Sequence, residues 1–130
     1  MRKLVPFVLL FLLAWSCKEP RSIEQFVKGE GPFVFSVDMS DSTALYDFDF
    51  YARVDAPEIP AEVQLLLRWT SPSDSVYRET VYLPLSDAVY SPYRTGVSPY
   101  EPGVWTLTAS LLPLPEGFRG LGLVVRKQSQ

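Results

Sequence analysis

The only cysteine of the chain, Cys17, follows directly after an apolar segment at residues 4–15. Two basic residues precede this segment, and the segment is shorter than the ~20 apolar residues that a membrane-spanning helix needs. A basic start followed by a short apolar run is typical of a secretory signal peptide. Since Cys17 has no second cysteine to pair with, the sequence predicts that its thiol carries lipid once residues 1–16 are removed.

The alternative for this segment is an ordinary secretory signal, because Ala14 and Ser16 also satisfy the small-x-small rule for cleavage. That interpretation leaves a free thiol in an oxidising compartment, which favours the lipidated form. Acyl chains attached to one terminus hold a folded domain stably on a membrane. We therefore expect a cell-envelope protein with a lipid anchor, located at the outer membrane because Lys18 rather than an aspartate follows the cysteine.

Acid–base chemistry in this chain would have to rely on carboxylates. The sequence contains no histidine, which excludes Ser-His-Asp and Cys-His arrangements. Asp47 and Asp49 stand two residues apart, and Glu79 could sit near them to form a catalytic pair of carboxylates. Because polar residues alternate with apolar ones in any half-exposed strand, we interpret Asp47 and Asp49 as a solvated face. We expect a protein that is not an enzyme and has no cofactor.

Two further groups of residues could bind ligands. Asp38 and Asp41 could offer oxygen ligands to calcium, although Ser/Asp turns are common for backbone reasons alone. Trp69 and Trp105 could form a platform for sugars. Both tryptophans share a register with leucines of their own segments, so we predict that they pack in the core.

The stretch at residues 86–103 reads as a long irregular loop, which in a compact domain is often functional. It carries Tyr90, Tyr93, Arg94 and Tyr100, and tyrosine and arginine are enriched at protein interfaces. The sequence therefore indicates a partner-binding loop. The alternative is that these tyrosines lie flat over the edge of a sheet.

The elements that must position these residues are strands. Apolar and polar residues alternate with a period of two in several runs, as in antiparallel strands with one buried face. The predicted inward-facing residues are Phe33, Phe35, Val37, Tyr46, Phe48, Phe50, Ala52, Val54, Val63, Leu65, Leu67, Trp69, Tyr77, Val81, Leu83, Leu85, Trp105, Leu107, Ala109 and Leu111. The proline-containing segment 55–61 predicts a corner or a crossing between sheets. SPSDS predicts a hairpin turn, and Gly122 predicts a bulge or a close approach of other atoms to the backbone.

This pattern predicts an all-β fold, a two-sheet antiparallel β-sandwich of the immunoglobulin-like or jelly-roll-like kind. We divide the chain into a signal peptide at 1–16, a lipidated N-terminus and tether at 17–32, and one sandwich domain at 33–130. The formal net charge of −3 and the lack of a basic stripe argue against nucleic acid as a partner.

The order of these features resembles the gliding-motility lipoprotein GldH family of Bacteroidota. The resemblance covers most of the chain after Cys17 and departs from the family only in a shorter segment at 86–101. The motifs that carry it are FVFSVD, LYDFDFYAR ending at Arg53, SPSD beginning at Ser71, VYRETVYLPL, PGVWTLTASL and GLGLVV.

The resemblance implies an accessory lipoprotein of the bacterial envelope that is associated with gliding motility and its secretion machinery. It implies envelope proteins as partners and no catalytic residues. The alternative function is a β-sandwich lipoprotein of the outer membrane that binds glycans or small ligands. Tryptophan exposed on a sheet or in a cleft would favour this alternative, and tryptophan in the core would favour the first.

Overall fold

The computed structural model describes residues 22–56, 59–85 and 90–129. The predicted signal peptide and Cys17 lie outside the described residues, and so does the start of the predicted loop, 86–89. None of the described residues forms a helix long and apolar enough to cross a membrane. The strands are β1 (Ser22–Lys28), β2 (Phe33–Met39), β3 (Ala44–Val54), β4 (Glu62–Thr70), β5 (Val76–Pro84), β6 (Ser91–Val97), β7 (Gly103–Leu111) and β8 (Phe118–Ser129).

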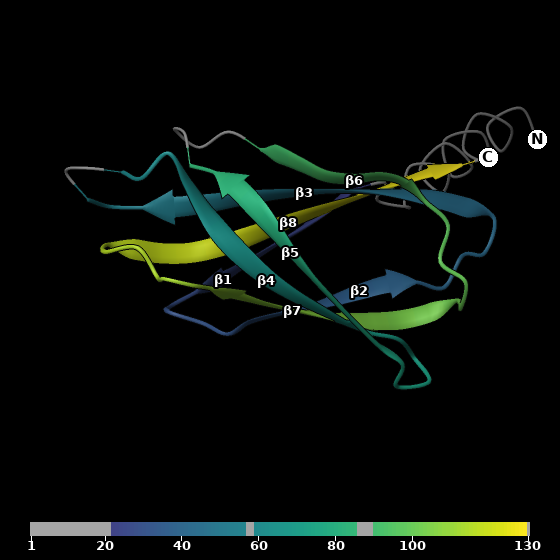
Figure 1. Ribbon diagram of the computed structural model, residues 1–130. Coiled ribbons are helices and arrows are strands. Elements are labelled where there is room, and N and C mark those ends of the chain that lie inside the picture. The colour runs from purple at the N-terminus through teal and green to yellow at the C-terminus, as the bar shows by residue number, and fades with distance from the viewer. Residues whose placement is uncertain (1–21, 57–58, 86–89, 130) are drawn as a thin grey trace, which may run out of the picture.

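The strands form two antiparallel sheets that stack as two layers, which confirms the predicted β-sandwich (Figure 1). One sheet has the order β1-β8-β3-β6 and is called sheet A here; the other has the order β2-β7-β4-β5 and is called sheet B. Only β4 and β5 are hairpin neighbours, and every other connection crosses between the sheets. Eight strands that alternate in this way form a jelly roll, and not an immunoglobulin-like sandwich.

The core fills the space between the inner faces of the two sheets. The alternation in β2 places Phe33, Phe35 and Val37 in this core, as predicted. Leucines of β4 and β7, from the same sheet as β2, and of β8, from the opposite sheet, belong to the same buried cluster. The largest fully buried side chains are Tyr46, Phe33, Phe35, Phe48, Phe50, Leu65, Leu67, Leu107, Leu121, Leu123 and Val37.

The domain begins earlier in the chain than residue 33, the predicted boundary. β1 pairs with β8 along its whole length, from Ser22 opposite Arg126 to Lys28 opposite Gly120. The prediction of a tether over 17–32 is therefore wrong for residues 22–28, which form a strand of the domain. Alternation was too weak to reveal a strand here, because no residue of β1 is fully buried and the half-buried ones, Gln25, Phe26 and Val27, are consecutive.

The predicted irregular loop at 86–103 contains β6, which pairs with β3 as the edge strand of sheet A. Pro92 and Gly96 hid this strand in the sequence, because both residues are rare inside central strands. An edge strand tolerates them, since one side of its backbone needs no ladder partner. The register shifts between Tyr46 and Asp49 show the irregularity that they introduce.

Sheet A carries a second, smaller apolar layer on its outer face. The ring of Tyr51 lies directly over Gly122 of β8, and Phe26 lies over the neighbouring Gly120. The Phe26 and Tyr51 rings stack at 5.8 Å, and Tyr90 meets Tyr51 edge-on at 5.1 Å. Burial raises the pKa of Tyr51 to about 12, with a smaller contribution from the nearby Glu24 carboxylate. Gly122 thus marks a close approach to the backbone, as predicted, and the group that approaches is an aromatic ring.

Candidate binding cleft

A cleft opens between β5 and β6, the edge strands of the two sheets on one side of the sandwich. Its volume is about 390 Å³, and half of its lining residues are aromatic. The lining residues are Met39, Phe48, Trp69, Tyr77, Glu79, Tyr93, Arg94, Val97, Ser98, Pro99, Tyr100 and Trp105. This combination of aromatic walls and a few polar groups is typical of a ligand or partner site.

The aromatic side chains form a continuous set of edge-to-face contacts. Trp69 meets Phe48 at 5.4 Å and Trp105 at 6.2 Å between ring centroids. Tyr100 stands perpendicular to Trp105 at 5.4 Å and meets Tyr77 at 5.9 Å. Trp105 belongs to the buried core and its Nε1 donates to the Glu101 carbonyl oxygen at 2.9 Å, whereas Tyr77 and Tyr100 are exposed at the mouth.

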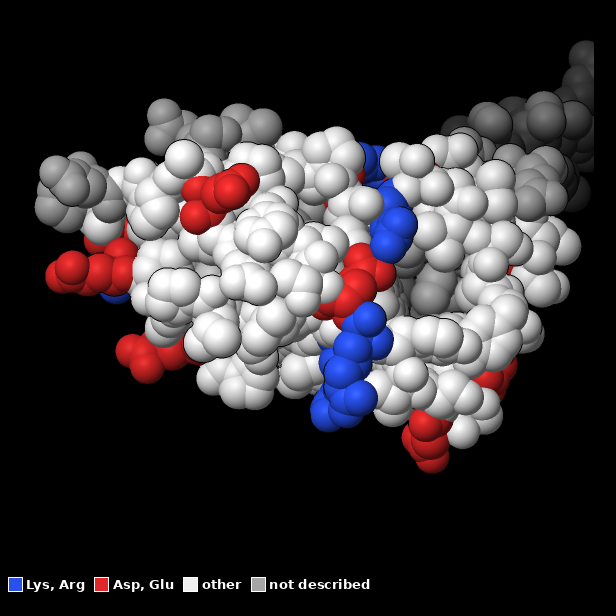
Figure 2. All heavy atoms as spheres, viewed as in Figure 1, with Lys and Arg blue, Asp and Glu red and all other residues white. Residues whose placement is uncertain are grey.

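Two polar contacts join the two sheets and border the cleft. Trp69 Nε1 donates to the Tyr93 hydroxyl at 3.0 Å, between β4 and β6. Arg94 Nη2 donates to both carboxylate oxygens of Glu79 on β5, at 3.0 and 2.8 Å. In Figure 2, basic and acidic side chains lie beside each other in a band across the middle of this face, and most of the surface on either side of the band is uncharged. The cleft therefore has apolar walls and a fixed ion pair at its edge.

The structure separates the four residues predicted to form a binding loop. Tyr93 packs against the core, Arg94 pairs with Glu79, and Tyr100 lies at the mouth of the cleft. Tyr90 lies on the outer face of sheet A, where its hydroxyl donates to Glu24 at 3.2 Å. Three of the four thus line one cleft and the fourth does not. The tyrosines do not share a single surface, because only Tyr93 lies within β6, whereas Tyr90 precedes the strand and Tyr100 follows it.

The predicted solvated face of β3 is buried instead. Gly96 N donates to Asp47 Oδ1 at 2.7 Å, and Gln128 donates to the other oxygen of the same carboxylate. Asp49 is buried beneath Arg126, with which it forms an ion pair. The longer side chains of β8 cover these short carboxylates, which is why alternation alone gave the wrong exposure. Glu79 lies on the other sheet, so the structure does not bring the three carboxylates together.

The aspartates suggested as calcium ligands are engaged in the turn between β2 and β3. Asp38 accepts hydrogen bonds from the backbone and hydroxyl of Ser40. Asp41 accepts from the backbone N of Thr43 at 3.0 Å and pairs with Lys127 at 3.0 Å. Hydrogen bonding from the Thr43 hydroxyl, with a contribution from Lys127, lowers the pKa of Asp41 to about 2. Among the described residues, no three potential ligands gather into a metal site.

Tryptophan packing follows the prediction for Trp105 and follows it in part for Trp69, which is half-buried and also lines the cleft. Tyr77 was predicted to face inward and is instead half-exposed at the cleft mouth. The sequence contained an indication that Tyr77 is exposed. Two charged residues, Arg78 and Glu79, follow it directly, and a strand end with so many polar groups is rarely buried on both faces.

Comparisons with known protein families, curated proteins and solved structures gave no match. The chemistry of the cleft is therefore interpreted from its own residues. The resemblance to the GldH family stays a prediction from the sequence.

Proposed function

We propose that this chain is a non-catalytic interaction protein of the bacterial cell envelope, lipid-anchored through Cys17 and related in role to GldH lipoproteins. Its partner is an envelope protein of the gliding or secretion machinery, at the outer membrane. The observation that carries the proposal is the aromatic cleft between β5 and β6. Trp, Tyr and Arg dominate the residues that supply most binding energy at protein interfaces, and the cleft contains all three.

The cleft suits an apolar side chain of a partner. Its walls are apolar rings held by their neighbours, so little ordering entropy is lost when a side chain enters. The Arg94–Glu79 pair at its edge fixes charged groups that can orient a partner's backbone or charged side chains. The engaged carboxylates of Asp47, Asp49 and Glu79 support a binding role rather than acid–base catalysis.

The anchor is tested by replacing Cys17 with alanine. Without a thiol no lipid can be attached, so the protein is expected to move from the membrane fraction to the soluble envelope fraction. Metabolic labelling with fatty acid should disappear at the same time. Wild-type protein that takes up no label would contradict the lipid anchor while leaving the cleft proposal untouched.

The cleft is tested by replacing Tyr100 with alanine. Tyr100 is 61% exposed and its ring contributes to the mouth of the cleft, so partner affinity should fall by about tenfold or more while thermal stability stays close to wild type. The measurement is the yield of specific cross-linked product with envelope proteins, followed by the dissociation constant for the purified pair.

Tyr82→Ala is the matched control. Tyr82 lies on β5, is 63% exposed and does not line this cleft, so its loss should leave cross-linking unchanged. Equal cross-linking by wild type and both variants would reject the cleft as the interaction site.

A glycan ligand is the second candidate function. Two observations favour it: Trp69 lies in a cleft rather than wholly in the core, and the jelly-roll architecture is shared with lectin domains. Architecture alone does not assign function, so the cleft residues decide. Binding on a glycan array that is lost in Tyr100→Ala, together with no protein cross-link in the wild type, would favour this candidate over a protein partner.

A further inference from the structure

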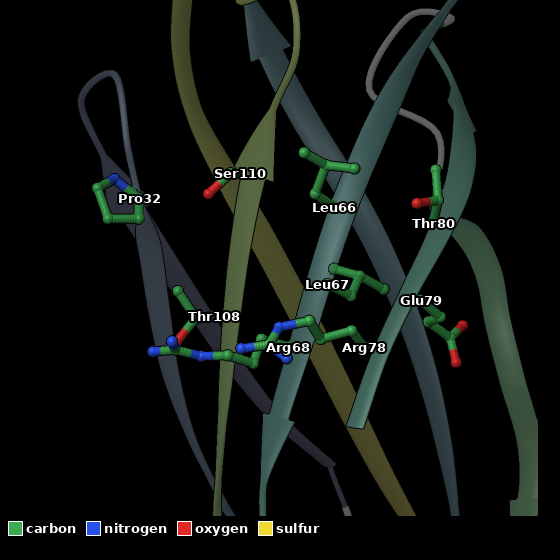
Figure 3. Close-up of a pocket in the computed structure, with 9 residues that line it drawn as sticks. All are labelled: Pro32, Leu66, Leu67, Arg68, Arg78, Glu79, Thr80, Thr108 and Ser110. Atoms are coloured by element: carbon green, nitrogen blue, oxygen red, sulfur yellow. The ribbon is translucent and has the colours of Figure 1, made fainter. Parts of the chain in front are cut away.

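The outer face of sheet B brings two arginines together. Arg68 on β4 and Arg78 on β5 are directly opposite each other in the antiparallel ladder. Both side chains are exposed, and they extend in the same direction, from β5 and β4 toward β7 (Figure 3). Like charges placed opposite each other on neighbouring strands destabilise a sheet. This arrangement therefore has a cost that the fold itself does not explain.

Neither arginine has an ion-pair partner among the described residues. Arg94, Arg119 and Arg126 each pair with a carboxylate, on Glu79, Asp55 and Asp49 respectively. Of the described residues that border the hollow around Arg68 and Arg78, only Glu79 is acidic, and both of its oxygens accept hydrogen bonds from Arg94. The two guanidinium groups thus form a concentrated positive site on a chain with a net charge of −3.

Hydroxyl groups surround the arginines in a shallow hollow of about 580 Å³. Thr108 of β7 stands opposite Arg68 in the next ladder, and Leu66 is flanked by Ser110 and Thr80 in the neighbouring row. Figure 3 shows these side chains among the residues that line the hollow. Hydroxyls can donate to anionic oxygens and also accept from sugar hydroxyls.

We propose that Arg68 and Arg78 form a binding site for a phosphate monoester, separate from the aromatic cleft. Two guanidinium charges on adjacent strands are balanced by a doubly charged group, which a phosphate monoester provides and a single carboxylate does not. Planar guanidinium groups also match phosphate oxygens with paired hydrogen bonds. The hollow leaves room beside the phosphate for a sugar or a headgroup in contact with Leu66 and the hydroxyls.

The test uses glucose 1-phosphate as a soluble phosphate monoester, titrated into the purified protein while backbone amide shifts are recorded. Saturable shifts confined to β4, β5 and β7 are expected, and the affinity should fall as salt concentration rises. The double variant Arg68→Gln, Arg78→Gln should bind about tenfold or more weakly. Arg119→Gln is the matched control, since Arg119 is exposed and pairs with Asp55 elsewhere on the molecule.

A vesicle arm separates a free ligand from a lipid headgroup. It uses Cys17→Ala protein, so that no anchor contributes, with phosphatidylcholine vesicles that contain or lack phosphatidate. Binding of the soluble ester assigns a free ligand, and binding of phosphatidate vesicles alone assigns a headgroup. Equal binding by the double variant, or no binding in either arm, would overturn the proposal.

A stability measurement without ligand gives an independent readout. Arg78→Gln removes the like-charge contact, so its thermal midpoint should equal or exceed that of wild type. A clearly lower midpoint would show that Arg78 supports the fold, and would overturn its assignment to ligand binding.

Discussion

Replacing Phe35 with alanine is expected to lower the free energy of unfolding by about 3–5 kcal/mol. Phe35 is 0% exposed and lies at the centre of β2, opposite Leu107 of β7. Removing its ring deletes buried apolar surface and leaves a cavity between two sheets that are too rigid to close over it. Chemical denaturation monitored by tryptophan fluorescence measures the change, with the slope of the transition expected to stay constant.

The control for this prediction is the neighbouring residue in the same strand. Val34 is 53% exposed on the opposite face of β2, so Val34→Ala should change the free energy of unfolding by less than about 0.5 kcal/mol. Since a slip of one residue exchanges the two faces of a strand, a larger effect at Val34 than at Phe35 would show that the register of β2 is wrong.

Replacing Gly122 with alanine should destabilise the protein by about 1–3 kcal/mol. The sign is informative, because removing a glycine from the interior of a strand ordinarily stabilises it by about 0.5–1 kcal/mol. Here an added Cβ would lie 2.1 Å from the ring of Tyr51, which is held between Phe26 and Tyr90. The ring would have to leave its position, and the outer apolar layer of sheet A would be lost.

A double-mutant cycle with Tyr51→Ala identifies the cause. Once the ring is absent, Gly122→Ala should be neutral or stabilising, so the two changes should couple by roughly 1 kcal/mol or more. Additive effects of the two substitutions would mean that the ring is not what excludes a side chain at this position. Thermal and chemical unfolding of the four proteins provide the measurement.

The sequence predicted the core better than the outer faces. Strict alternation in β2 and β7 predicts that one face of each strand is buried and the other is exposed to water. The structure confirms this for Phe35 and Leu107, which are both buried. The same rule failed for Asp47 and Asp49, because side chains from β8 cover them. Alternation describes one strand at a time. The burial of Asp47 and Asp49 depends instead on β8 becoming the neighbour of β3, which alternation does not predict.

The cleft could be predicted only in part for a related reason. Tyr93, Arg94 and Tyr100 were recognised by residue type, but their segment was interpreted as one irregular loop. Their partners Glu79 and Trp69 lie far away in sequence and meet them only because β5 and β6 are edge strands on the same side of the sandwich. Pairing between edges of different sheets leaves no local pattern in a sequence. The paired arginines Arg68 and Arg78 escaped notice in the same way, because only the hairpin register places them opposite each other.

Because β1 begins at Ser22, the folded domain starts close in sequence to the predicted lipidation site, Cys17, and this limits its distance from an anchor there. Only four residues separate Cys17 from Ser22, the first residue of β1. Even a fully extended chain spans no more than about 3.6 Å per residue, so an anchor on Cys17 would hold Ser22 within about 18 Å of the lipid. A linker this short would keep the sandwich in a thin layer next to the membrane. Within that layer its effective concentration toward another component of the same membrane would be high, and toward anything beyond the reach of the linker it would be close to zero.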